Sequence, residues 1–72
     1  MQKIKVLENI LQQIVDNSNT IYYYDIETLS TDGDLLVNAV LSNEDGIVIR
    51  EFEGTYFEVL CDVKLVLYGL LE

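Results

Sequence analysis

Carboxylates are the only side chains in this sequence that are numerous enough to suggest chemistry. There are 13 Asp and Glu against four Lys and Arg, and there is no His. Side chains two residues apart share one face of a β-strand. Such pairs can exchange protons, hold a metal ion or bind Lys and Arg of another protein. Three pairs have this spacing: Asp25 with Glu27, Asp32 with Asp34, and Glu51 with Glu53.

Catalysis and metal binding both lack supporting residues. The 72 residues offer little room for a substrate cleft and contain neither a Gly-rich phosphate loop nor a nucleophile elbow, so we expect no enzyme. Asp32-Gly33-Asp34 lacks the longer ligand series of a calcium loop and predicts a plain turn. Cys61 lies in an apolar segment without a His to activate it, which indicates a buried structural thiol. We expect no metal and no cofactor.

The charge balance restricts the kind of partner. No Lys or Arg occurs from Val6 to Ile49, and the formal net charge is −9. Such a chain repels nucleic acid and anionic membranes and attracts basic surfaces. We therefore expect a basic protein partner, with no direct binding to nucleic acid or membrane. Half of the residues are apolar, which suits a single small domain over residues 1–72.

The sequence predicts a cytoplasmic protein. Glu8 and Asp16 fall where a signal peptide needs an apolar run, and runs such as 65–68 are too short to cross a bilayer. The single Cys61 excludes an intramolecular disulfide, as is usual in a reducing compartment.

Two helices are expected at the two ends of the sequence. Apolar residues at helical spacing predict an amphipathic helix over 3–17. Thr55-Tyr56-Phe57-Glu58 matches a capping box and predicts a helix from 56 to about 71. The β-branched valines of this segment leave a strand over 63–68 as the alternative.

Three strands are expected between the helices. Alternating patterns predict strands over 20–29, 35–41 and 47–53, separated by turns at 30–34 and 43–46. The predicted fold is α+β in the order αβββα, a three-stranded antiparallel meander with two helices packed on one face.

The facing of the strand over 47–53 is ambiguous. Phe52 shares a face with Arg50, whereas two Ile share the other with Glu51 and Glu53. We expect Phe52 to point inward, because burying two carboxylates costs more than partly exposing two Ile.

This topology predicts an acidic surface at one end of the sheet. The first and third strands of a meander run parallel, so their C-terminal ends lie at the same end of the sheet. We expect three groups of carboxylates to gather there: those that end these two strands, those of the first turn, and the one at the start of the second helix. Neighbours are spaced roughly 6.7 Å along a strand and about 9.5 Å across two strands. The first spacing is similar to that of successive phosphates in a nucleic-acid strand. The predicted partner-binding residues are Tyr23, Asp25, Glu27, Asp32, Asp34, Glu51, Glu53 and Glu58.

Two alternatives accompany this prediction. The acidic face can serve only to keep the protein in solution, and Tyr23 can be an ordinary strand tyrosine. As a partner-binding residue, Tyr23 would supply the aromatic anchor that is common at interfaces.

The size, the acidity and the αβββα order resemble small phage anti-CRISPR proteins, some of which mimic DNA and block the duplex-binding site of a Cas nuclease. Small acidic immunity proteins and other DNA-mimic inhibitors are similar on the same grounds. The resemblance implies a non-enzymatic inhibitor that binds a basic nucleic-acid-binding protein and competes with its nucleic acid. The residues that carry it are Asp25, Glu27, Asp32, Asp34, Glu51, Glu53 and Glu58.

The second helix favours a different hypothesis. Its apolar arc is wider than a surface helix needs, and Gly69 leaves room for another backbone. The alternative function is a small structural or assembly protein that forms a homodimer through residues 56–71. Otherwise, this helix is simply the most buried element of a small core.

Overall fold

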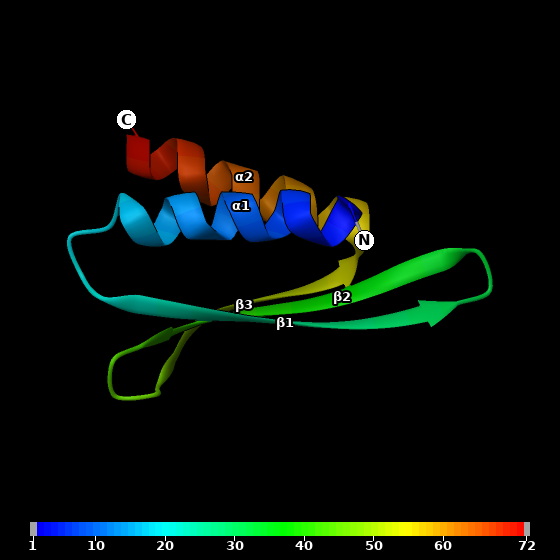
Figure 1. Cartoon of the computed structure of the whole chain (residues 1–72), viewed down its shortest axis with the longest axis horizontal. Helices are drawn as coiled ribbons and strands as arrows, with labels where there is room; N and C mark the ends of the chain where they lie inside the picture. The colour runs from blue at the N-terminus through cyan, green and yellow to red at the C-terminus, as the bar shows by residue number, and fades with distance from the viewer. Residues whose placement is uncertain (1, 72) are drawn as a thin grey trace.

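Two helices lie side by side across one face of a three-stranded sheet (Figure 1). The computed structural model describes residues 2–71. The elements, in order, are α1 (Gln2–Asp16), β1 (Tyr22–Thr31), β2 (Asp34–Asn43), β3 (Val48–Thr55) and α2 (Tyr56–Leu71). The predicted αβββα order is confirmed. The alternative of a strand over 63–68 is wrong, because these residues belong to α2.

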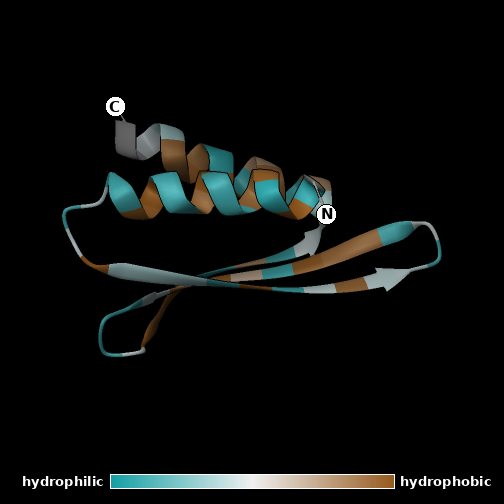
Figure 2. Ribbon diagram, in the orientation of Figure 1, coloured by the Kyte–Doolittle hydropathy of each residue, from teal (hydrophilic) through white to brown (hydrophobic). Residues whose placement is uncertain are grey.

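The core lies between the helices and the covered face of the sheet. β2 is the central strand and pairs antiparallel with both neighbours. In Figure 2, hydrophilic and hydrophobic residues alternate along α1, whose apolar stripe faces the sheet. Phe52 is buried, which confirms its predicted inward orientation. The buried residues are Leu7, Ile10, Leu11, Ile14, Val37, Ala39, Leu41, Phe52, Tyr56, Val59, Val63 and Leu67.

A β-bulge explains the ambiguous pattern of β3. Leu41 pairs with Arg50 but Ser42 pairs with Val48, so Ile49 is an extra residue on β3. The alternation changes phase at this point. Val48, which pairs with Ser42, therefore lies on the same face of the sheet as Glu51. An unbroken alternation would have placed Ile47 there instead.

The first hairpin is tighter and longer than predicted. Thr31 pairs with Asp34, so only Asp32 and Gly33 form the turn. Gly33 has φ +87°, a conformation that glycine adopts without strain. The hairpin extends beyond the ends of the helices (Figure 1). Because β1 continues to Thr31, Asp25 and Glu27 lie within the strand and do not close it.

The prediction that Cys61 is buried is wrong, because its side chain is exposed. α2 is apolar around most of its circumference, so its sequence does not reveal which side packs on the core. Tyr56, Val59, Val63 and Leu67 take that role, and this turns Cys61 to the outside. Within residues 2–71, no helix is long and apolar enough to cross a membrane.

Candidate functional site

Four carboxylates form two rows across the open face of the sheet, which is the face that the helices leave uncovered. Asp25 on β1 and Glu51 on β3 both pair with Val40 of the central strand. Glu27 and Glu53 both pair with Asn38. Ordinary strand spacing gives these four positions a rectangle of roughly 6.7 by 9.5 Å. We call Asp25, Glu27, Glu51 and Glu53 the acidic rectangle.

Hydrogen bonds hold two of these carboxylates in place. Asn38 Nδ2 donates to Glu51 Oε2 at 3.3 Å, and the backbone N–H of Ile26 donates to Asp25 Oδ1 at 3.0 Å. The underlying strands are fully paired with β2 over this region. The negative charges are therefore displayed on a rigid backbone and not on loops.

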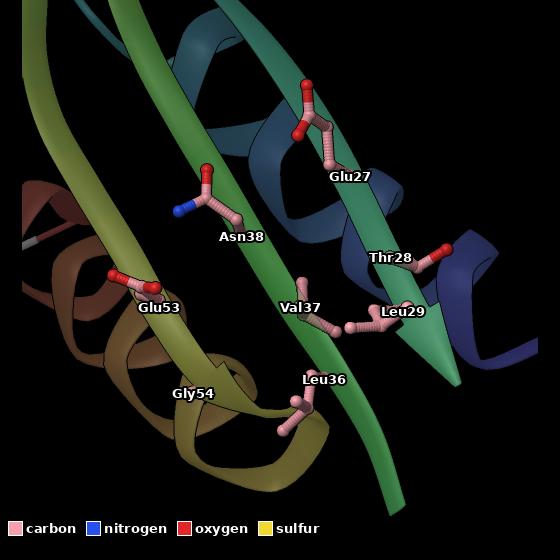
Figure 3. A pocket seen from close by; sticks show the side chains of 8 residues that line it. All are labelled: Glu27, Thr28, Leu29, Leu36, Val37, Asn38, Glu53 and Gly54. Atoms are coloured by element: carbon pink, nitrogen blue, oxygen red, sulfur yellow. The ribbon is translucent and has the colours of Figure 1, made fainter. Parts of the chain in front are cut away.

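A hollow of about 300 Å³ adjoins the rectangle at its end nearest the first hairpin. Figure 3 shows Glu27, Asn38 and Glu53 on three neighbouring strands, with Leu29 and Leu36 next to them and the helices behind the sheet. Leu29 and Leu36 are paired across β1 and β2 and give the hollow an apolar wall. The hollow thus combines an apolar surface with carboxylates at its rim.

The charges of the two layers differ. All four basic residues lie on the helix side: Lys3 and Lys5 on α1, Lys64 on α2, and Arg50 in register with buried Leu41. Four carboxylates of the helices, Glu8, Asp16, Glu58 and Asp62, balance them. The excess negative charge of residues 2–71 is therefore carried by the strands and their hairpins. Local attraction for a cation is strongest on the sheet side.

The structure does not bring all of the predicted carboxylates together. Asp32 lies in the first hairpin turn, and Asp34 is the first residue of β2. Asp34 is four residues along β2 from Asn38, the residue that pairs with Glu27. At ordinary strand rise this is roughly 13 Å. The long hairpin thus separates Asp32 and Asp34 from the acidic rectangle.

Glu58 is engaged in a helix cap. Its Oε1 accepts hydrogen bonds from the Thr55 backbone N–H at 3.1 Å and from Thr55 Oγ1 at 3.0 Å, and its own N–H donates to Thr55 Oγ1 at 3.4 Å. This confirms the predicted capping box. The backbone bond first, and the hydroxyl bond second, lower the pKa of the Glu58 carboxyl below its usual value. A structural role accounts for this residue.

Glu58 also explains a nearby glycine. Gly54 has φ +145°, and a Cβ built there would lie 3.1 Å from Glu58 Oε1. Glycine therefore lets β3 turn directly into the capped helix.

Tyr23 lies on the open face in the row next to Asp25 and is 60% exposed. Sequence reasoning predicted the central strand but left its residues out of the site, although Asn38 and Val40 lie between the paired carboxylates. It also missed Leu29 and Leu36, which line the hollow. Asn38, the one polar residue of the apolar segment over 35–41, was the available signal.

No family model, curated protein or solved structure matches this chain. In the part of the chain that the structure describes, no three Cys, Asp or Glu are grouped so that they would hold a metal ion. The resemblance to anti-CRISPR proteins stays a prediction. Function must therefore be inferred from the residues of the open face.

Proposed function

We propose that this protein is a non-enzymatic inhibitor that binds a basic nucleic-acid-binding protein, such as a Cas nuclease, and competes with its nucleic acid. One observation carries the proposal: four carboxylates stand in two rows on an open β-surface. No basic residue shares that surface among residues 2–71. A groove that binds phosphates presents Lys and Arg, the side chains that these carboxylates would bind.

Affinity would come from charge-assisted hydrogen bonds between carboxylates and Arg or Lys, which are about twice as strong as neutral ones. The hollow next to Glu27 and Glu53 suits the same partner side chains, because their methylene stems would contact Leu29 and Leu36. The net charge of −9 would speed the encounter and make it sensitive to salt.

The test is competition with duplex DNA for a panel of purified duplex-binding proteins, Cas nucleases included. The wild type should capture at least one member and displace its DNA at low salt, with less binding at high salt. Asp25→Asn/Glu27→Gln/Glu51→Gln/Glu53→Gln should weaken this binding by at least about 100-fold, since truncation of a buried charge pair costs about 2–5 kcal/mol.

A matched control separates the pattern from the total charge. Glu8→Gln/Asp16→Asn/Glu44→Gln/Asp45→Asn removes the same charge away from the acidic rectangle and should still bind. Equal loss in both variants would mean that only net charge matters. Full inhibition by the rectangle variant, or no binding by the wild type across the panel, would refute the proposal.

A further inference from the structure

The outward side of α2 carries an apolar stripe that is largely exposed, although Lys3 Nζ lies 5.6 Å from the centroid of the Phe57 ring at its first residue. Phe57, Leu65 and Tyr68 are 66%, 69% and 56% exposed, and Cys61 is exposed between them. Positions 57, 61, 65 and 68 are spaced by four, four and three residues, so they share one helix face. These four residues are called the α2 stripe. They point away from the core, which Val59 and Val63 contact.

A hollow lies beside the α2 stripe, so this face of the molecule is not flat. It measures about 310 Å³ and lies between the helices and the sheet. Its lining residues are Leu65, Val66 and Gly69 of α2, Ile14 of α1, and Tyr22, Leu41, Ile49 and Arg50 of the strands. A Cβ added at Gly69 would meet nothing within 4 Å. Glycine weakens a helix, and here it leaves an open place where a large side chain of a neighbour fits.

The distribution of charge indicates which kind of partner can bind to the α2 stripe. The helix layer has balanced charges, whereas the strands and hairpins carry the excess negative charge. Two copies of the chain repel one another through their sheets but not through their helices. A strongly basic partner, in contrast, would be drawn to the sheet. The α2 stripe is thus the surface through which this acidic chain can approach itself.

We propose that α2 is a homodimer interface, in which the α2 stripes of two copies pack together about a two-fold axis and a large side chain of each copy enters the hollow of the other. An isologous contact of this kind is the commonest form of dimer. The aromatic and aliphatic side chains of the stripe are those enriched at the centres of interfaces. Both acidic rectangles stay uncovered, on opposite outer sides of the dimer. This interface does not depend on the inhibitor function.

Sedimentation of the full chain tests this proposal. At about 100 µM protein and 0.5 M NaCl, the wild type should have twice the monomer mass of 8.2 kDa. Higher salt should strengthen the dimer, because it screens the repulsion between two acidic molecules. Leu65→Lys should weaken dimerisation by at least about tenfold, although it lowers the net negative charge.

Leu29→Lys is the matched control, because it makes the same change at a similarly exposed leucine on the open face. It should leave the dimer intact. Circular dichroism checks that both variants fold. A monomeric wild type under these conditions, or a dimer that Leu29→Lys disrupts and Leu65→Lys does not, overturns the proposal.

Cys61 provides a second measurement on the wild type. It lies near the middle of the α2 stripe, so a two-fold axis there brings the two thiols close together. Diamide, which accepts the two electrons and two protons released, should convert the dimer into a disulfide-linked species. Leu65→Lys should reduce the yield several-fold, and an unchanged yield would count against the interface.

Discussion

The covered face and the open face of the sheet are built from alternate residues of the same three strands. Phe52 is buried under the helices, whereas its neighbours Glu51 and Glu53 belong to the acidic rectangle. Ala39 is buried, while Asn38 and Val40 lie between carboxylates. Packing against the helices therefore determines the residue types of the covered face, and charge determines those of the open face. Substitutions on the open face should alter binding with little effect on folding.

The strongest test of this contrast compares two adjacent residues. Phe52→Ala should lower the free energy of unfolding by about 3–5 kcal/mol, because it removes a large side chain from the core. Glu53→Ala should change it by less than about 0.5 kcal/mol. Urea denaturation followed by circular dichroism measures both. Similar losses in the two variants would contradict a division of roles between the faces.

Neutralising the acidic rectangle should stabilise the fold. At 10 mM salt, Asp25→Asn/Glu27→Gln/Glu51→Gln/Glu53→Gln should raise the free energy of unfolding by roughly 1–2 kcal/mol, since four like charges about 7–12 Å apart repel one another. The gain should nearly vanish in 1 M salt. Urea titrations at both salt concentrations measure it.

The control for that prediction removes charge from the helix layer. Glu8→Gln/Asp16→Asn/Asp62→Asn should give a smaller gain, because basic residues balance these carboxylates. An equal gain per charge would show that repulsion is spread evenly over the molecule.

The junction between the two layers should respond to acid. Because the pKa of Glu58 is lower in the folded state than in the unfolded chain, its contribution to stability is present above the usual glutamate range. It is lost as the pH falls through the folded-state pKa. NMR titration of the Glu58 carboxyl carbon should show the lowered value, and Thr55→Ala should raise it.

Thr55→Ala should also lower the free energy of unfolding by about 1 kcal/mol at neutral pH, as expected for the loss of an N-cap. Thermal unfolding at pH 7 measures this. A normal Glu58 titration in the wild type would mean that the capping box does not form in solution.

The smallest expected effect concerns the centre of the open face. Val40→Lys places an ammonium group between Asp25 and Glu51, and each cross-strand pair contributes about 0.2–1 kcal/mol. Loss of the half-buried valine offsets this, so stability should change by less than about 1 kcal/mol. Thermal melts at low and high salt measure it. Binding of a basic partner should fall, and a loss of stability above about 2 kcal/mol would assign Val40 to the core.

The order of the elements was predictable because local patterns agree with the fold. The capping box of Thr55 and Glu58 marked the start of α2, and the cost of burying carboxylates oriented Phe52. The length of the first hairpin was not predictable. Ser30 and Thr31 suit a turn or a strand, and only pairing with β2 decides between them. That pairing moved Asp25 and Glu27 away from Asp32 and Asp34.

The facing of α2, and of the few residues of β3 before its bulge, was also beyond the sequence. α2 is apolar around most of its circumference, so packing alone selected Val59 and Val63 for the core and left Cys61 outside. The bulge at Ile49 interrupts the two-residue period of β3, which made its pattern ambiguous. Both failures concern side-chain direction, which depends on neighbouring elements.

The strand order β1-β2-β3 leaves β1 and β3 as sheet edges with backbone groups available for pairing. An exposed edge strand is a template on which the strand of another chain can pair, which is how fibrils grow. Here electrostatic repulsion opposes such pairing, because Asp25 and Glu27 line one edge strand and Glu51 and Glu53 the other. This electrostatic repulsion between copies disappears as the pH approaches the isoelectric point of about 4.1, where the net charge is zero. We therefore expect the carboxylates to oppose amyloid-like assembly at neutral pH, and acid to remove that opposition.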